Sequence, residues 1–286
     1  MTGVTVLVDD VRSFSDRRAC CTARSSDAGV ALLRALRGVR IEHLWLDHDL
    51  VRDDTVWPVV HLLDDTALAG EPFDVGTVHV HAARSGPAHE VVVSLRRAGY
   101  NVERSTDLRM WRRTARMSTG QDLVGEWTTE RAVQLAIHHH EGQRDKGDPS
   151  IPYVTHPLRV MAAVRAAGYD ERYQRVAVLH DGVEDTRLEE NDLRAGGAPE
   201  EEVEAVLSVT KRPGEGKYPD RVQRAAANEI GGVVKGFDML DNSDPERLAT
   251  LARRDAAKAQ GLREKYAGGL QLLDQLRPGW RQAGTA

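Results

Sequence analysis

Four ionisable side chains follow an apolar run in the middle of the chain. The run from Val176 to Leu179 leads into His180 and Asp181, and Glu184 and Asp185 follow one helical turn later. On a helix, residues four apart share a face, so His180 would lie beside Glu184 and Asp181 beside Asp185. Buried charge is costly unless it is paired or bound to a metal ion. This spacing therefore predicts a metal site with acid and base groups beside it.

Residues of matching type occur before and after this stretch. His156 stands directly before Pro157, and Asp238 lies on one helical face with Lys235 and Asn242. Two histidines and two aspartates suit a divalent ion such as Mn²⁺ that keeps open positions for water. Such an ion lowers the pKa of a bound water enough for it to attack phosphorus near neutral pH. Carboxylates one helical turn from His180 and Asp181 are well placed to orient or deprotonate this water.

Long amphipathic stretches must carry these residues, because strand patterns end near Trp127. Pro157 suits the first turn of a helix, and Gly142 suits a helix end. The pattern predicts an all-α second half. We expect helices at about 129–140, from 157 onward, at 173–184, 199–210 and 220–241, and one or two more across 245–276.

The first half alternates short apolar strands with helical patterns. We expect strands at 4–8, 19–24, 41–46, 77–81 and 100–103, with helices between them from about 25 onward. This alternation predicts an open parallel sheet covered by helices on both faces, with its functional edge at the carboxyl ends of the strands. Polar residues gather at those ends and form a second candidate site: Asp9, Asp10, Asp47, His48, Asp49, His79 and His81.

Composition and length set the frame for both halves. The chain has 286 residues and a net charge of −5, which gives no reason to expect membrane binding or general nucleic-acid affinity. Cys20 and Cys21 are adjacent and poorly placed for a disulfide, so we expect a reducing, cytoplasmic setting. The predicted organisation is an α/β domain at 1–115, a linker at 116–126 and an all-α domain at 127–286. The oligomeric state and the orientation of the domains stay open.

The acid pair Asp9-Asp10, with Asp47 ending a later strand, resembles a response-regulator receiver domain. In that family the acid pair holds Mg²⁺ and the later aspartate accepts a phosphoryl group. The family also places a lysine after its last strand. Every lysine of this chain lies at Lys146 or later, so the resemblance does not extend to that residue.

The motif Leu46-Asp47-His48-Asp49-Leu50, with His79 and His81 on a later strand, is more similar to the cyclic-phosphate-processing receiver domains. This resemblance implies a receiver-like fold and allows three roles for the first half. It could hold a divalent metal or phosphate, with Mg²⁺ as the candidate ion. It could also be a degenerate regulatory module, or a packing domain with a polar rim.

The second half, over about 127–276, resembles the HD-superfamily hydrolases of the Rel/Spo alarmone type, a family that includes small stand-alone alarmone hydrolases. The resemblance rests on motifs in the family's order: His140-Glu141-Gly142-Gln143, Pro152-Tyr153, His156-Pro157, His180 to Thr186, Val209-Thr210-Lys211, and Lys235-x-x-Asp238-x-x-x-Asn242. Members remove pyrophosphate from the 3′ position of guanosine tetra- and pentaphosphate with Mn²⁺, in the stringent response.

The resemblance assigns a role to each matching position. It implies metal ligands at His156, His180, Asp181 and Asp238, and catalytic acids at Glu184 and Asp185. We expect substrate contacts at Arg144, Lys146, Tyr153, Lys211, Lys235 and Asn242. The alternative for Tyr153 is core packing, and for the isolated lysines Lys146 and Lys211 it is a solvated surface.

Three departures from the family's pattern leave the substrate open. Asp145 stands at a position where the family has a basic residue, Asp241 where it has histidine, and Pro245 where it has threonine. We therefore predict an Mn²⁺-dependent phosphohydrolase of a phosphorylated nucleotide, with guanosine 3′,5′-bis(diphosphate), ppGpp, as the first substrate. One alternative is a phosphoesterase acting on cyclic phosphates, RNA ends or another nucleotide such as NADPH. The other is a nucleotide-binding sensor without turnover.

Overall fold

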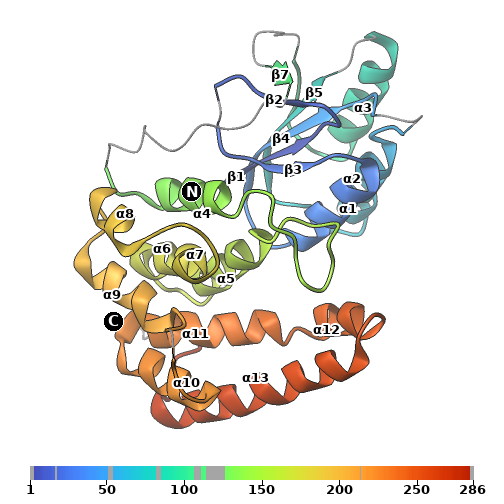
Figure 1. Cartoon of the computed structure of the whole chain (residues 1–286). Helices are drawn as coiled ribbons and strands as arrows, with labels where there is room; N and C mark the ends of the chain where they lie inside the picture. The colour runs from blue at the N-terminus through green and yellow to red at the C-terminus, as the bar shows by residue number, and fades with distance from the viewer. Residues whose placement is uncertain are drawn as a thin grey trace. The chain divides into compact units, whose positions relative to one another are not determined.

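The chain folds into two compact units. The computed structural model describes residues 3–16, 18–50, 54–81, 85–105, 111–113, 126–212 and 214–283 (Figure 1). One unit comprises Met1–Gln121 with Ser150–Pro152, and the other comprises Asp122–Pro149 with Tyr153–Ala286. The predicted linker at 116–126 lies outside the described residues except for its last position. No helix in the described part of the chain is long and apolar enough to cross a membrane.

A five-stranded parallel sheet forms the first unit, with the strand order β3-β1-β4-β5-β6. Its strands are β1 (Val4–Val8), β3 (Cys21–Ala23), β4 (Ile41–Asp47), β5 (Val75–His81) and β6 (Val102–Arg104). Three helices connect them: α1 (Ser26–Ala35), α2 (Trp57–Leu68) and α3 (Ser85–Arg97). The predicted parallel α/β fold is confirmed, with strand and helix ends shifted by a few residues.

Among the described residues, the helices cover one face of the sheet, whereas we expected helices on both faces. The three helical connections all run in the same direction along the sheet, so right-handed crossovers bring α1, α2 and α3 to one face. These helices contact each other in sequence, α1 with α2 and α2 with α3. The segment between β1 and β3 contains no helix among its described residues, and it carries the short strand β2 (Arg12–Phe14) instead.

Strand β2 covers part of the other face of the sheet. It pairs antiparallel with β7 (Trp111–Arg113), which lies 97 or more residues later in the chain. Phe14 packs edge-on against Trp45, with ring centroids 5.3 Å apart, and Leu7 completes this buried cluster. Sequence patterns missed both strands because each is only three residues long and pairs over a long distance.

Helices alone make up the described secondary structure of the second unit, which confirms its predicted class. They are α4 (Thr129–His139), α5 (Thr155–Ala166), α6 (Glu171–Leu179), α7 (Gly182–Asp185), α8 (Glu190–Ala195), α9 (Glu200–Val209), α10 (Tyr218–Ala227), α11 (Glu229–Asn242), α12 (Pro245–Ala252) and α13 (Ala256–Leu276). Helix α11 packs against α5, α6, α9 and α13 (Figure 1). This central place explains its mostly buried surface.

The single helix expected at 220–241 is instead two helices, α10 and α11. Asn228 has an extended backbone between them, and its side chain caps α11 by accepting a hydrogen bond from the backbone N–H of Gly231. Glycines weaken an isolated helix, but in α11 they allow close packing. A side chain at Gly231 would collide with Ser208 of α9, and one at Gly236 would collide with the ring of Trp280.

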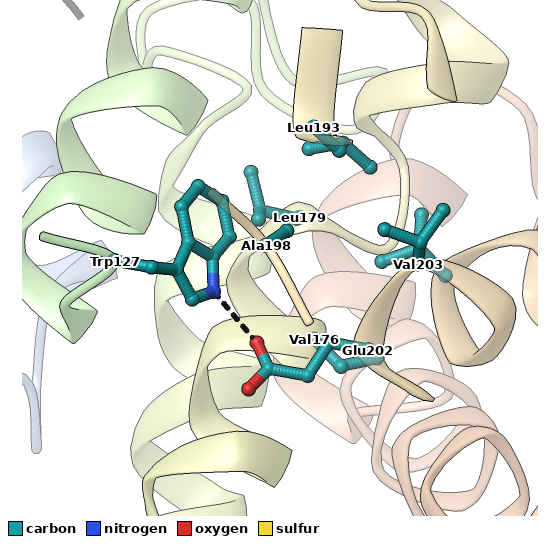
Figure 2. Close-up of a pocket in the computed structure, with 8 residues that line it drawn as sticks. Trp127, Val176, Leu179, Leu193, Ala198, Glu202 and Val203 are labelled. Carbon is teal, nitrogen blue, oxygen red and sulfur yellow. Dashed lines mark hydrogen bonds between the residues drawn. The ribbon is translucent and has the colours of Figure 1, made fainter. Parts of the chain in front are cut away.

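An apolar pocket lined by residues of α6, α8 and α9 belongs to the core of this unit. Its lining includes Val176 and Leu193, and Trp127 closes one side (Figure 2). The Trp127 indole N–H donates to the buried carboxylate of Glu202 at 2.8 Å, and Arg175 forms an ion pair with the same carboxylate at 2.6 Å. Since the buried charge is paired within the fold, this pocket has a structural role.

Candidate metal centre and acid cluster

Three separate elements of the second unit deliver the predicted metal ligands. His156 lies in the first turn of α5, and Asp238 lies on the last turns of α11. His180 follows the last residue of α6, and Asp181 precedes α7, so this pair forms the junction between the two helices. Both histidines and Asp238 are buried, because α11 packs against α5 and α6.

The ligand atoms converge on one small volume. Nε2 of His156 lies 3.4 Å from Oδ2 of Asp181 and 3.3 Å from Oδ1 of Asp238. Nε2 of His180 lies 3.1 Å and 3.6 Å from the same two oxygens. Two imidazole nitrogens and two carboxylate oxygens therefore face each other, although they come from positions up to 82 residues apart.

The outer nitrogens of both histidines are held by the protein. Nδ1 of His180 donates to the backbone carbonyl of Ala177 at 2.7 Å, and Nδ1 of His156 donates to Oδ2 of Asp241 at 2.7 Å. Such hydrogen bonds fix the tautomer that leaves Nε2 free to bind a metal ion. Nε2 of His180 is buried and has no hydrogen-bond partner within the described residues. The donor set thus fits a divalent metal ion.

The charges at this centre favour a bound cation. Burial alone would lower the pKa of His156, but hydrogen bonds to Asp181, Asp238 and Asp241 raise it to about 9. Against the effect of burial, Asp181 and Asp238 hold the pKa of His180 well above its usual range. The carboxylates therefore attract protons onto the histidines, and a metal ion would replace those protons.

Asp241 and Asp145, two departures from the family pattern, belong to one network. Arg159 donates to Asp241 through Nε at 2.7 Å, and Arg247 donates to Asp241 and to Oδ2 of Asp145, the latter at 2.7 Å. Asp145 is buried, and it also accepts hydrogen bonds from two backbone N–H groups of its own loop. Asp145 is therefore an internal anchor for this loop, and Asp241 is the partner that orients His156.

Three of the predicted substrate contacts donate hydrogen bonds to the carboxylates of the predicted ligands Asp181 and Asp238. The hydroxyl of Tyr153 donates to Oδ2 of Asp181 at 2.5 Å, Nζ of Lys235 donates to Oδ2 of Asp238 at 2.7 Å, and Nδ2 of Asn242 donates to Oδ1 of Asp238 at 2.5 Å. Burial and the Asp181 carboxylate raise the pKa of Tyr153, so its hydroxyl keeps its proton and donates the hydrogen bond to Asp181. These contacts orient the acids that face the histidines.

The predicted catalytic acids lie at the exposed rim. Glu184 and Asp185 are exposed on the short helix α7, directly after the ligand pair. Oε2 of Glu184 accepts a hydrogen bond from the backbone N–H of Lys211 at 2.8 Å, and Gln143 donates to the backbone carbonyl of Asp185 at 2.7 Å. The predicted continuous helix through His180 and Glu184 is wrong, because the chain breaks between α6 and α7.

The remaining predicted contacts are basic and exposed. Arg144 and Lys146 flank the anchored Asp145, and Nζ of Lys146 lies 5.9 Å from the centre of the Tyr153 ring. The side chain of Lys211 is on the surface near Glu184, whose carboxylate its backbone binds. The loop at 144–146 thus presents two cations outward from a fixed acidic anchor.

His140 is a site residue that the sequence indicated only through its motif. It is 1% exposed, its Nδ1 is 2.8 Å from Oε1 of Gln143, and its Nε2 has no hydrogen-bond partner among the described residues. Its ring lies 5.1 Å from that of Tyr153. The His140-to-Gln143 motif therefore links Asp185 to the buried side of the centre.

The first unit contains a second cluster, made of carboxylates. Ligand-type oxygens of Asp9, Asp10 and Asp47 all lie within 4.8 Å of one another at the carboxyl ends of β1 and β4. Nη1 of Arg12 forms an ion pair with Asp47 at 3.1 Å and lies 3.8 Å from Asp9. Burial and the neighbouring Asp9 raise the pKa of Asp47 to about 7.

The histidines predicted for this second site do not all reach it. His81 ends β5 opposite Asp47, is buried, and contacts the backbone carbonyl of Ser105. His48 is buried too, and its ring is paired with Asp49 at 2.8 Å. His79 stacks on Trp45 within the sheet, with ring centroids 4.0 Å apart, and is therefore a packing residue.

Comparisons with known proteins give one match to a family model and matches to curated enzymes. Residues 4–97 match the model of the cyclic-phosphate processing receiver domain. A GTP pyrophosphokinase of Streptomyces coelicolor is 38% identical over 198 residues, which are 65% of this chain and 23% of that protein. A guanosine-3′,5′-bis(diphosphate) 3′-pyrophosphohydrolase of Vibrio cholerae is 30% identical over 118 residues, which are 38% of this chain and 16% of that protein.

Among solved structures, a metazoan ortholog of SpoT described as hydrolysing ppGpp covers 56% of this chain and 96% of its own, at 22% identity and a TM-score of 0.40. The chain spans less than a quarter of the length of the Streptomyces and Vibrio enzymes. Its N-terminal half thus resembles a cyclic-phosphate-processing receiver domain, and the rest of the chain resembles the Rel/SpoT enzymes.

Proposed function

We propose that the second unit hydrolyses a phosphate or pyrophosphate ester of a nucleotide with a divalent metal ion, Mn²⁺ first. The observation that carries this proposal is the convergence of Nε2 of His156 and His180 on oxygens of Asp181 and Asp238. These four residues would hold the ion, which activates water and neutralises phosphate charge when bound. The first substrate to test is ppGpp, since one relative of this chain is named as its 3′-pyrophosphohydrolase and another as a GTP pyrophosphokinase.

Residues around the centre have separate tasks in this proposal. The backbone N–H of Lys211 holds Oε2 of Glu184, so Oε1 is the atom that we assign to accept the proton of the attacking water. Asp185 stands next to it, fixed through its carbonyl by Gln143. The exposed cations of Arg144 and Lys146 would attract the phosphates of the nucleotide.

The test incubates the full chain with Mn²⁺ and ppGpp and separates the products by chromatography. We expect release of pyrophosphate, loss of activity with a chelator, and a fall of roughly a thousandfold in kcat for Asp238→Ala, since metal assistance contributes several kcal/mol. Asp274→Ala is the matched control, because Asp274 is a half-exposed aspartate that pairs with Arg281 on the surface. Equal activity of Asp238→Ala and wild type would refute the metal assignment.

A second candidate reaction follows from the first unit. Its match to cyclic-phosphate processing receiver domains and its three clustered acids favour a cyclic phosphate as an alternative substrate. The substrate panel therefore includes 2′,3′-cyclic nucleotides and NADPH beside ppGpp. Turnover of a cyclic nucleotide that is lost in Asp47→Asn, but kept in Asp238→Ala, would assign that reaction to the first unit. Nucleotide binding without any turnover would favour a sensor.

A further inference from the structure

Two lysines of the second unit lie over the same tyrosine ring. Nζ of Lys265, on α13, is 4.2 Å from the centre of the Tyr218 ring, and Nζ of Lys235, on α11, is 5.7 Å from it. Lys265 also lies 4.8 Å from the ring centre of Tyr266. Lys235 is bound to the predicted ligand Asp238, so this cluster adjoins the metal centre. No motif in the sequence indicated Tyr218, Lys265 or Tyr266.

The cluster is built by close packing and is fixed in place. Gly269 lies one turn after Lys265 on α13, and a side chain there would come within 2.6 Å of Met239 and 3.0 Å of Tyr218. Helix α13 therefore approaches α10 and α11 closely because residue 269 is glycine. The rings of Tyr218 and Tyr266 meet edge to face, 6.0 Å apart, and together they form the surface on which Lys265 lies.

Two polar groups of this cluster have no anionic or hydrogen-bonding partner among the described residues. Lys265 is exposed and forms no salt bridge with any described residue, although Lys235 is paired with Asp238. The hydroxyl of Tyr218 is buried and has no hydrogen-bond partner among the described residues. An anion with several oxygen atoms would satisfy both groups, because an ammonium group and a hydroxyl both donate hydrogen bonds.

Neighbouring charges support this interpretation. Partial desolvation of its ammonium group and the nearby Lys235 lower the pKa of Lys265, whereas Asp238 and Glu184 act in the opposite direction. The charge of Lys265 therefore interacts with those of the predicted metal ligand Asp238 and the predicted catalytic acid Glu184. A like-charged neighbour at an unpaired lysine costs free energy that a bound anion would recover.

We infer that Lys265 and the Tyr218 hydroxyl bind a phosphoryl oxygen of the substrate beside Asp238, and that they select substrates carrying a pyrophosphate group. The inference rests on the proposed function, because it places the pyrophosphate group that water attacks next to the metal centre, with the nucleoside oxygen as the leaving group. Lys235 connects this phosphoryl subsite with the metal centre, since it contacts Asp238 and lies over the same tyrosine ring.

The test measures binding of inorganic pyrophosphate to the Mn²⁺-loaded full chain by calorimetry. We expect Lys265→Met to raise the Kd for pyrophosphate at least tenfold, and Tyr218→Phe to raise it severalfold. Lys258→Met is the matched control, because Lys258 is an exposed lysine on the same helix, and its Kd should equal that of wild type. Mn²⁺ binding and the melting temperature of each variant check that it is folded.

The outcomes separate this inference from the proposed function. If the chain turns over no nucleotide but binds pyrophosphate through Lys265, the inferred subsite stands and the proposed reaction fails. If ppGpp is hydrolysed and Lys265→Met keeps the wild-type KM and Kd, the subsite is wrong and the reaction stands. No pyrophosphate binding to wild type, or equal losses in Lys265→Met and Lys258→Met, would also overturn it.

Discussion

The two acid-rich clusters of this chain differ in how their negative charge is balanced. In the second unit, two histidines direct Nε2 at two carboxylates, and their outer nitrogens are fixed by Ala177 and Asp241. In the first unit, Asp9 and Asp47 share the guanidinium of Arg12. A prepared set of nitrogen and oxygen ligands favours a transition metal, whereas carboxylates alone favour a hard ion such as Mg²⁺.

Clustering of acids is therefore a weaker indication of a metal centre than the arrangement of the side chains around the cluster. The histidine centre has an outer layer in which Asp241, Arg159 and Arg247 orient His156. The acid cluster includes a cation of the protein itself, so part of its charge is balanced without a metal ion. We therefore expect tight metal binding in the second unit and weak binding in the first.

A large effect on metal binding should come from removing the outer layer of the histidine centre. Asp241→Asn keeps the size of the side chain but loses the charge that holds Arg159 and Arg247 and orients His156. We expect Mn²⁺ affinity to fall by about 10- to 100-fold, as outer-layer changes at metal sites do. Calorimetric titration with Mn²⁺ measures this loss, and Asp244→Asn serves as the neighbouring control. An unchanged affinity would show that Asp241 does not position His156.

A smaller effect should distinguish the acid cluster by its pH dependence. The pKa of Asp47 is raised to about 7 from an ordinary value near 3.8, so the folded state binds a proton that the unfolded state releases. Stability of the first unit therefore falls as pH rises from about 4 to about 7 and then levels off. Asp47→Asn should remove this fall and leave the variant more stable at pH 8, by on the order of 2–4 kcal/mol.

Hydrogen exchange of peptides from β1 and β4 reports on this unit alone within the full chain. Asp65→Asn, an exposed change on α2, is the control and should follow wild type at every pH. Added Mg²⁺ should reduce the difference at pH 8 if the three acids hold a cation. A first unit whose exchange slows as pH rises from 5 to 7, after correction for intrinsic rates, would contradict the assignment to Asp47.

The sequence predicted the fold class and the convergence of the four candidate ligands, because helix periodicity and ordered motifs are local features. It could not predict which side chains form hydrogen bonds or ion pairs with residues that are distant in the sequence. Asp145 and Asp241 read as departures from a pattern, and only their shared contact with Arg247 shows that they form one network. Lys265 lies in no motif, and its role depends on the packing of α13 against Tyr218.

Misjudged elements have similar causes. The break at Asn228 is set by a side-chain cap that competes with a continuous helical pattern across 220–241. The helices of the first unit lie on one face because their three connections run in one direction along the sheet, and no local pattern encodes the pairing of β2 with β7. In both cases contacts that are distant in sequence or specific to one side chain overrode the average propensity of the segment.

Binding of Mn²⁺ to the full chain tests whether the histidine centre of the second unit, and not the acid cluster, is the tight metal site. Equilibrium titration of wild type, His180→Ala and Asp47→Asn compares the two clusters in one experiment. We predict one tight site in wild type that Asp47→Asn retains and that His180→Ala loses by at least about a hundredfold. Binding of Mn²⁺ to His180→Ala as tightly as to wild type, or loss of the tight site in Asp47→Asn, would contradict a metal centre at His180.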